Sequence, residues 1–270
     1  MVGEKTWFSL QRFLYDSIVY YMSTTTEILQ VHLNSKYADK IYNGSSNSYC
    51  EWFLPVIEIP LQHTIYISCQ HAVIPYTFYN IDSTNNTLKY LLNGTTYTIT
   101  IDEGNYNINQ LVTFLKNKIN LVTVTYNSIN SKLTFTNSTY DFSFLNTSTC
   151  LEILGFSSGV TVTSISRILT SSNVINLQSK HCICIQSNFH TGSINSVNKH
   201  ESSIVCSIPI NTPPYSMLTY QNHNNLKYNL FNNVITSITL KLCDQKNQLI
   251  NLNGCHWSAS IQLEVVKFVE

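Results

Sequence analysis

Hydrophobic and polar residues alternate along much of this chain, and the alternation is clearest in its last quarter. Between residues 234 and 242, one side of an extended chain would carry Val234, Thr236, Ile238, Leu240 and Leu242. A polar break follows at residues 244–247, and residues 257–265 then repeat the pattern. Period-two alternation is typical of half-buried antiparallel strands, with one face on a core and one in water. The chain is therefore expected to end in strands of a β-sandwich.

The earlier part of the chain shows the same pattern in shorter stretches. We expect strands at residues 28–33, 64–73, 174–177, 181–186, 203–210 and 217–220. In the stretch 64–73, one face is expected to hold Ile65, Ile67, Cys69, His71 and Val73. Residues 52–59 are apolar but interrupted by Pro55, which cannot donate a ladder hydrogen bond and so predicts an edge strand at best.

Residues 83–157 predict a different kind of unit. Asn93-Gly94 between two apolar stretches is a strong signal for a tight hairpin turn. Asn107 can cap a helix, with Gln110 as its capping-box partner. The apolar stripe of this helix consists of Ile108, Leu111, Leu115, Ile119 and Val122. Strands are expected at 122–126, 132–136 and 140–145, and residues 151–156 close a compact α+β unit.

Strands, an α+β unit and then strands again predict one sandwich that carries an insertion, and not two tandem domains. The expected fold class is all-β with a small α+β insertion, built as an antiparallel β-sandwich. No stretch of the sequence reaches the roughly 18 apolar residues that a membrane-spanning helix needs.

Residues 1–26 are expected to form an N-terminal arm ahead of the sandwich. Its apolar residues recur at helical spacing, so the arm could dock on a partner or on a membrane surface. These residues are Trp7, Leu10, Leu14, Ile18 and Tyr21. The alternative is a disordered or optional extension, because Met22 begins a polar run and could itself be the true start.

The chain of 270 residues is unusually poor in charge, with 43% hydrophobic and only 11% charged residues and a formal net charge of zero. A nucleic-acid binder needs a basic face to meet phosphates, so specific nucleic-acid recognition is not expected. Neutral polar groups cost less to desolvate than charged ones, and such a surface suits extensive contacts between proteins.

Eight cysteines are spread over the sequence, and most fall inside apolar alternating strands. Their positions are Cys50, Cys69, Cys150, Cys182, Cys184, Cys206, Cys243 and Cys255. A free cysteine in such a strand behaves as a small buried hydrophobe. No secretory signal is apparent, so we expect reduced thiols and synthesis in the cytoplasm.

The run His181-Cys182-Ile183-Cys184 is the one metal-like cluster in the sequence, and Cys206 or Cys255 could complete a zinc site. Neighbouring residues of a strand point to opposite faces, so ordinary buried cysteines are the favoured interpretation. We therefore expect no metal site and no cofactor.

Catalytic groups are also not expected. Cys255 and His256 are adjacent on a predicted turn, so their side chains diverge and a nucleophile–base pair is disfavoured. Trp257 is interpreted as a core anchor of the last strand. Asp102 and Glu103 lie between a strand and the helix, where acidic residues favour a helix N-terminus. The protein is expected not to be an enzyme.

Three groups of residues together resemble a known family. They are Asn251-Leu-Asn-Gly-Cys-His-Trp257 before the last strand, Ile208-Pro-Ile210 before a proline-rich loop, and Gly104-Asn-Tyr106 with Leu154-Gly-Phe156 around the insertion. In this order, the set is similar to the penton and minor capsid proteins of virophages, Polinton-type elements and related large DNA viruses.

The resemblance implies a single jelly roll, formed by residues 27–82 and 158–270, with residues 83–157 as an outward-facing insertion. It implies a structural capsid protein, the pentameric vertex (penton) subunit of an icosahedral particle. The implied partners are copies of itself in a homopentamer and a double jelly-roll major capsid protein. Other minor capsid proteins, an internal membrane or a host receptor are further possible partners, and the N-terminal arm would reach under the shell.

Other functions stay open on the sequence. The chain could be a minor capsid protein between capsomers, or a β-sandwich module that binds a receptor or a glycan through Tyr- and Asn-rich loops. The expected location for the capsid roles is the virion, after synthesis in the host cytoplasm. A mass measurement would separate a pentamer from a monomeric recognition module.

Overall fold

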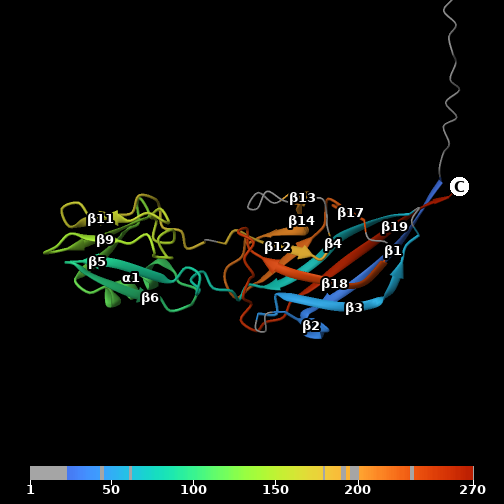
Figure 1. Ribbon diagram of the computed structural model, residues 1–270, viewed down its shortest axis with the longest axis horizontal. Coiled ribbons are helices and arrows are strands. Elements are labelled where there is room, and N and C mark those ends of the chain that lie inside the picture. The colour runs from blue at the N-terminus through green and yellow to red at the C-terminus, as the bar shows by residue number, and fades with distance from the viewer. Residues whose placement is uncertain are drawn as a thin grey trace, which may run out of the picture.

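The computed structural model describes residues 23–42, 46–60, 63–178, 180–189, 193–194, 201–231 and 234–269. Figure 1 shows two bodies along the long axis of the molecule, joined by thin connections. Each body has its own hydrophobic core. One core draws on both halves of the chain, from Leu33 to Leu263, and the other on residues from Ile81 to Leu169. The chain therefore forms a discontinuous sandwich and a continuous inserted domain.

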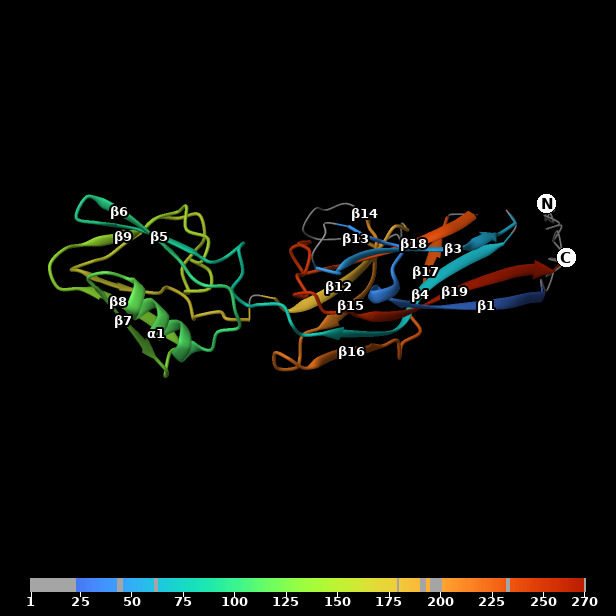
Figure 2. The ribbon, with the colours of Figure 1, turned by 90° about the horizontal axis from the view of Figure 1, so that it is seen from below.

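The sandwich consists of two antiparallel sheets, seen edge-on in Figure 2. The first sheet has the order β1-β19-β4-β16, and β17 also pairs with β4. Its strands are β1 (Ser23–Asn34), β19 (Ser258–Val269), β4 (Thr64–Pro75), β16 (Met217–Gln221) and β17 (Tyr228–Leu230). The second sheet has the order β15-β12-β18-β3-β2. Its strands are β15 (Ile204–Pro209), β12 (Cys182–Ser187), β18 (Val234–Cys243), β3 (Tyr49–Glu58) and β2 (Lys40–Ile41).

Two smaller elements complete this body. A short 3-10 helix, η1 (Ser35–Tyr37), links β1 to β2, and a small strand pair lies in the connection between β12 and β15. The pair consists of β13 (Ser193–Ile194) and β14 (Glu201–Ser202). The expected N-terminal arm lies outside the described residues up to position 22, and residues 23–26 belong to strand β1 instead of an arm.

The long strands of the sandwich pair like one long hairpin folded over on itself. The first strand, β1, pairs with the last, β19, and inside this pair β3 pairs with β18. Further inside, β4 pairs with β16, and the innermost pair is β12 with β15. Successive pairs alternate between the two sheets. This nested pairing is the double Greek key of a jelly roll, so the expected fold class is confirmed.

A β-bulge decides which side chains of β4 face the core. The alternation predicted His71 and Val73 on the buried face, but Ala72 and Ile74 are the fully buried residues and His71 is exposed. The register of β4 against β19 shifts at this point and leaves Gln70 without a partner residue in β19. One extra residue in a strand moves every later side chain to the opposite face, which is why the sequence pattern failed here.

A second bulge changes which residues of β18 are buried. It lies opposite the proline of β3 and explains why a proline is tolerated in that strand. Ile235 is buried and Val234 is exposed, the reverse of the prediction, whereas Ile238 and the alternate residues after it are buried as expected. The register of β18 against β3 shifts between Ile235 and Ser237, opposite the segment of β3 that holds Pro55. A proline is tolerated there because it needs to supply no ladder hydrogen bond. On its other side, β3 pairs with the two-residue strand β2.

Trp257 anchors the start of the last strand, as the sequence indicated. Its side chain is 2% exposed, and its indole N–H donates to the carbonyl of Asn47 at 2.7 Å. Its ring meets that of Trp52 edge to face, with the ring centres 6.0 Å apart. This contact joins the two sheets of the sandwich, because Trp52 lies on β3 and Trp257 leads into β19.

The inserted domain packs one helix with two small sheets. The helix is α1 (Ile108–Lys118), and the sheets have the orders β10-β9-β5-β6 and β11-β8-β7. The strands are β5 (Thr87–Leu92), β6 (Thr95–Thr100), β7 (Val122–Asn127), β8 (Lys132–Asn137), β9 (Phe142–Phe144), β10 (Val162–Thr163) and β11 (Ile168–Thr170). No helix in the described part of the chain is long and apolar enough to cross a membrane.

Local signals in this domain were accurate. The side chain of Asn107 accepts from the backbone of Gln110 and the side chain of Gln110 accepts from the backbone of Asn107, both at 2.9 Å. Leu111 and Leu115 are fully buried beneath the helix. Asn93 and Gly94 both have positive φ, as a tight hairpin turn between β5 and β6 requires.

The inserted domain ends later than the expected residue 157. Strands β10 and β11 pair with β9 and β8, and Leu169 is part of the second core. Residues 174–177 form no strand, but Ile175 and Leu177 pack against the same core. Pairing to distant strands places these residues in the inserted domain, and the sandwich resumes only at β12.

Candidate assembly surfaces and the cleft between the domains

The cysteines of the suspected metal cluster are packing residues. His181 is exposed just before β12, whereas Cys184 is 7% exposed and lies beside Cys243 of the next strand. Burial raises the pKa of the Cys184 and Cys243 thiols to about 11. A protonated thiol is a poor metal ligand and a poor nucleophile. Within the described residues, no group of three or more His, Cys, Asp or Glu side chains could hold a metal ion.

The other cysteines are also mostly buried. Cys50 and Cys150 are fully buried, and burial raises the pKa of their thiols to about 11 and about 12. The Cys206 thiol meets that of Cys69, and this contact together with burial raises the pKa of Cys206. All eight cysteines are free in the structure. The expectation of buried, unpaired cysteines therefore holds for most of them, with Cys182 and Cys255 half-buried.

His256 has a structural partner. Its Nδ1 lies 3.2 Å from the hydroxyl of Ser35, and that hydroxyl also accepts the backbone N–H of Trp257 at 3.0 Å. These contacts tie the end of β1 to the start of β19 and direct the His256 ring toward Ser35. The arrangement positions the start of the last strand.

Asp102 and Glu103 do not act on the helix in the way the sequence suggested. The helix begins at Ile108 behind its cap Asn107, and its first turn contains no acidic residue. The intervening chain is a loop in which Gly104 forms a bridge with Ile81 at the base of the domain. The two carboxylates are exposed at this base.

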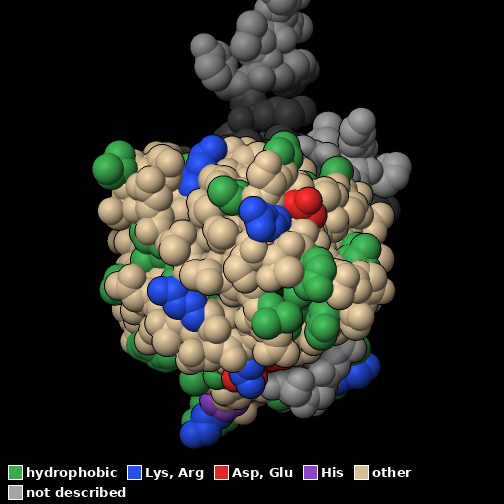
Figure 3. Space-filling model, turned by 90° about the vertical axis from the view of Figure 1, so that its left-hand side faces the viewer, with side chains coloured by type: hydrophobic (Ala, Val, Ile, Leu, Met, Phe, Trp, Pro, Cys, Tyr) green, Lys and Arg blue, Asp and Glu red, His purple; other side chains and the backbone are tan. Residues whose placement is uncertain are grey.

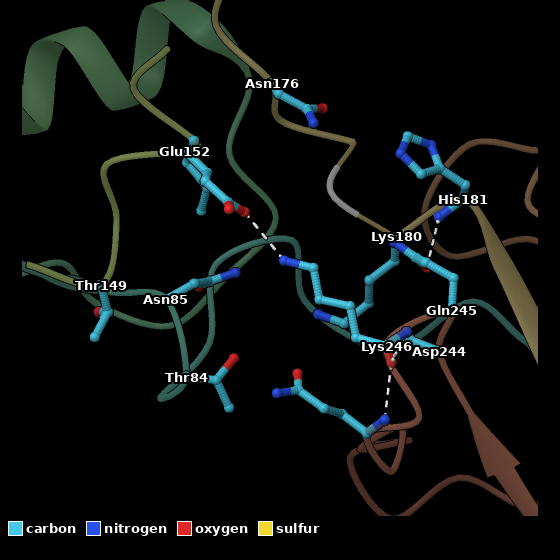
Figure 4. Close-up of a pocket in the computed structure, with 12 residues that line it drawn as sticks. Thr84, Asn85, Thr149, Glu152, Asn176, Lys180, His181, Asp244, Gln245 and Lys246 are labelled. Carbon is cyan, nitrogen blue, oxygen red and sulfur yellow. Dashed lines mark hydrogen bonds and ion pairs between the residues drawn. The ribbon is translucent and has the colours of Figure 1, made fainter. Parts of the chain in front are cut away.

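A polar cleft of about 290 Å³ separates the inserted domain from the sandwich (Figure 4). Glu152 from the inserted domain and Lys246 from the loop after β18 meet across it at 3.0 Å. Lys246 lowers the pKa of the Glu152 carboxyl by hydrogen bonding and by its charge. Both side chains are more than half exposed, so this ion pair adds little stability.

The two connections between the bodies are held together more firmly. Lys180, on the returning connection, contacts Asp82 on the outgoing one at 2.7 Å and donates to the carbonyl of Tyr79. Burial would raise the pKa of the Asp82 carboxyl, but hydrogen bonds from Lys180 and Thr84 and the charge of Lys180 outweigh it, so this pKa is lowered. The Asp82–Lys180 pair therefore clamps the base of the inserted domain.

One side of the sandwich, here called the second flank, is formed by the edge strands β15 and β16 and the loop between them. Residues 203–226, which include both strands, contain no Lys, Arg, Asp or Glu. Tyr215 is 77% exposed and Met217 is 58% exposed on this flank. An uncharged edge with large exposed apolar side chains is a surface that can be desolvated at low cost.

The opposite side, here called the first flank, is formed by β1, η1, β2 and the neighbouring part of β3. Tyr37, Ile41 and Phe53 are exposed on it. Two of its carboxylates already have partners within the subunit. Asp39 accepts the backbone N–H of Phe53 at 2.7 Å, and Glu51 accepts the hydroxyl of Tyr42 at 2.6 Å. The first flank is thus also available for a protein contact.

The end of the sandwich remote from the inserted domain has an apolar hollow of about 250 Å³ between the two sheets. Leu29, Ile57 and Leu263 are among the residues that line it, and His63 lies at its rim. The Nδ1 atom of His63 is buried there without a hydrogen-bond partner in the described part of the chain. The strand β1, which follows the expected N-terminal arm, begins at this end.

These surfaces were not picked out from the sequence, although one signal was present. The absence of charge over residues 203–226 is visible in the sequence. What the sequence could not show is that β15 and β16 are both sheet edges on the same side of the molecule. The nested pairing decides this, since it leaves these two strands without outer neighbours among the residues that the structure describes.

The sandwich and the inserted domain together define a class of protein: a single jelly roll that carries an extra domain between its third and fourth long strands. No protein-family model matches the chain, and no curated protein matches it in sequence. Among solved structures, the chain is similar to the mavirus penton protein, with a TM-score of 0.40 and 11% identity over 90% of this chain and 98% of that one. It is also similar to VP17, a capsid protein of bacteriophage P23-77, with a TM-score of 0.21 and 7% identity over 91% of this chain and 99% of that one.

Proposed function

We propose that this protein is a structural subunit of an icosahedral capsid, and specifically the penton subunit that closes a vertex as a homopentamer. The observation that carries the proposal is the nested jelly-roll pairing, with one uncharged flank and, on the opposite side of the same sandwich, a flank whose Asp39 and Glu51 have partners within the subunit. The resemblance of three sequence motifs to those of penton and minor capsid proteins supports the same role.

The two flanks fit the geometry of a ring. A closed ring needs a heterologous interface, in which one side of each subunit meets the opposite side of the next. Here the second flank offers Tyr215 and Met217, and the first flank offers Tyr37, Ile41 and Phe53. Like charges do not meet in this arrangement, because one of the two flanks has none.

The ends of the sandwich would then have separate roles. The inserted domain extends from one end and would face outward, and the end with the apolar hollow would face the shell interior, where the N-terminal arm and the major capsid protein are the proposed partners. A position between capsomers as a minor capsid protein uses the same surfaces. The proposed location is the virion, after synthesis in the host cytoplasm.

Light scattering on the purified protein tests the ring. We expect a pentamer for the unaltered chain and loss of the pentamer for Met217→Asp and for Phe53→Asp, because each puts a carboxylate into every interface. Mixing these two folded variants is expected to give dimers and nothing larger, because each variant keeps one intact flank that matches the intact flank of the other. An isologous interface would not give this result.

Ile129→Asp is the matched control, since it places the same charge on an exposed isoleucine of the inserted domain. It is expected to remain pentameric. A folded chain that stays monomeric at all concentrations, and that is missing from the vertices in a particle reconstruction, would overturn the proposal. A stable monomer that binds a glycan array would favour the recognition module instead.

A further inference from the structure

The end of the inserted domain furthest from the sandwich gathers three segments that are separate in the sequence. Strand β5 runs away from the sandwich, and its antiparallel partner β9 runs back toward it. The same antiparallel relations place the turn between β10 and β11, the loop between β8 and β9, and the start of β7 at the far end. We call these three segments, residues 119–121, 138–141 and 164–168, the distal tip.

The distal tip exposes large apolar side chains from each segment. Leu121 is 72% exposed, Tyr140 is 43% exposed, and Ile165 and Ile168 are 81% and 50% exposed. Single exposed hydrophobic residues are common on proteins, but a group drawn from separate segments marks a contact surface. Figure 3 looks onto this end and shows apolar side chains grouped on a surface that is otherwise mostly neutral.

A buried asparagine holds the segments together. Asn137 is 3% exposed, and its side chain donates to the carbonyl of Leu121 at 2.7 Å and accepts the backbone N–H of Tyr140 at 2.6 Å. Its own backbone N–H donates to the carbonyl of Arg167 at 3.0 Å. The backbone segments that carry the exposed side chains are therefore joined to one another and are not independent loops.

The backbone at the tip is strained where it presents these side chains. Leu121, Ser166 and Arg167 all have positive φ, a conformation that residues other than glycine rarely adopt. The neighbouring hairpin of the same domain uses Asn93-Gly94, the pair that such a turn prefers. Strain kept at an exposed turn is characteristic of functional sites and needs support from the surrounding structure. Asn137 supplies part of that support.

The acidic residues of the inserted domain lie mostly at its base, whereas its cationic residues are spread over it, with Lys132 at the base end of β8. Near the tip, helix α1 ends with Lys116 and Lys118, and the tip itself holds Arg167 and the carboxylate of Asp141. The domain's other acidic residues, Asp102, Glu103 and Glu152, lie at the base beside the sandwich. Asp141 is moreover occupied by the N–H of Arg167 and the hydroxyl of Ser164. The distal end therefore combines an apolar tip with three cations, Lys116, Lys118 and Arg167, and one carboxylate, Asp141.

We propose that the distal tip is a contact surface for an anionic lipid bilayer. Protruding apolar side chains can enter the interfacial layer, a tyrosine suits its polar boundary, and surrounding Lys and Arg are attracted to anionic headgroups. The tip is a small convex group of side chains, which suits insertion into a bilayer better than the broad complementary face of a stable protein interface. This surface lies on the inserted domain and does not depend on the assembly role of the flanks.

Vesicle flotation of the full chain tests the proposal, with phosphatidylcholine vesicles and vesicles that also contain phosphatidylserine. We expect binding to the second kind, weakened by added salt because surface charges are screened. Leu121→Ser combined with Ile165→Ser is expected to lower the bound fraction by roughly tenfold or more, since each removes a side chain whose burial favours binding. Thermal unfolding of each variant shows that it is folded.

Ile129→Ser is the matched control, because Ile129 is 94% exposed but lies in the turn between β7 and β8 at the opposite end of the same sheet. Its binding is expected to be unchanged. Arg167→Gln with Lys116→Gln should reduce the preference for phosphatidylserine while leaving the apolar tip in place. Three outcomes would each overturn the proposal. The first is equal binding by the tip variant and the control, and the second is no binding of the unaltered chain to either kind of vesicle. The third is capture of a soluble protein by the tip without vesicle binding.

Discussion

The sandwich and the inserted domain are both built from antiparallel strands, but they bring those strands together over very different distances in sequence. In the sandwich, β1 pairs with β19, and the side chains of His32 and Ser260, 228 positions apart, are hydrogen-bonded at 2.8 Å. In the inserted domain, β5 pairs with β6 across a two-residue turn, and β7 pairs with β8 across four residues. Their surfaces differ too, since the sandwich has one uncharged flank and the inserted domain has an apolar end.

This difference bears on how the two bodies fold and work. Distant pairing requires long loops to be closed before the contacts are gained, whereas hairpins form locally and quickly. The inserted domain has its own core and is joined to the sandwich through two connections and a weak ion pair. The core of the inserted domain is therefore separate from the core that supports the flanks of the jelly roll.

The largest expected effect comes from Trp257→Ala. This change should destabilise the sandwich and leave the stability of the inserted domain unchanged. The variant loses the contact with Trp52 and the hydrogen bond to Asn47 in the sandwich core. Tryptophan-to-alanine changes in a core cost about 3–5 kcal/mol of unfolding free energy. Hydrogen exchange should show protection lost in β15 and β18 and retained in β7 and β8. Equal loss of protection in both bodies would show that they unfold as one unit.

An intermediate effect is expected within the inserted domain from Gly155→Ala. Gly155 has φ +81, and an added Cβ would clash with the carbonyl oxygen of Asn173 and lie 3.0 Å from that of Val174. Left-handed backbone and overpacking together should cost about 2–5 kcal/mol. Thermal unfolding measures the loss of stability, and hydrogen exchange in β8 shows that the loss lies in the inserted domain.

Gly159→Ala is its matched control. Gly159 has φ +71, but an added Cβ would meet nothing within 4 Å. Only the conformational cost of about 1–2 kcal/mol then remains. If the two alanine variants were equally unstable, the close approach of residues 173–174 to Gly155 would not be what closes the inserted domain.

The smallest effect is expected from the Asp82–Lys180 pair, which joins the two connections at the base of the inserted domain. Because the pKa of Asp82 is lowered in the folded protein, its contribution to stability is complete above the unfolded pKa of about 3.9 and is lost as the pH falls through the lower folded value. In urea unfolding, the difference between the unaltered chain and Asp82→Asn should be about 1 kcal/mol at neutral pH and should shrink toward zero below about pH 3. A difference that does not change with pH would contradict the role of the carboxylate.

Local patterns in the sequence were sufficient for the elements that depend on neighbours along the chain. The capping box at Asn107, the turn at Asn93-Gly94 and the alternation that ends in β19 all follow from such patterns, because caps, turns and strand faces depend on nearby residues. The buried cysteines were also accessible in this way, since their apolar strand neighbours indicated their surroundings.

Tertiary structure decided what depends on partners far away in the sequence. The bulges that reverse the faces of β4 and β18 arise from register with β19 and β3, and the late boundary of the inserted domain arises from pairing of β10 and β11 with earlier strands. The flanks and the distal tip are likewise products of pairing order. The sequence by itself determined most of the long strands and that the surface carries little charge, although residues 174–177 form no strand and β10 and β11 were not expected. Only the fold decided which strands became edges and which exposed side chains met, because both depend on long-range pairing that no local pattern encodes.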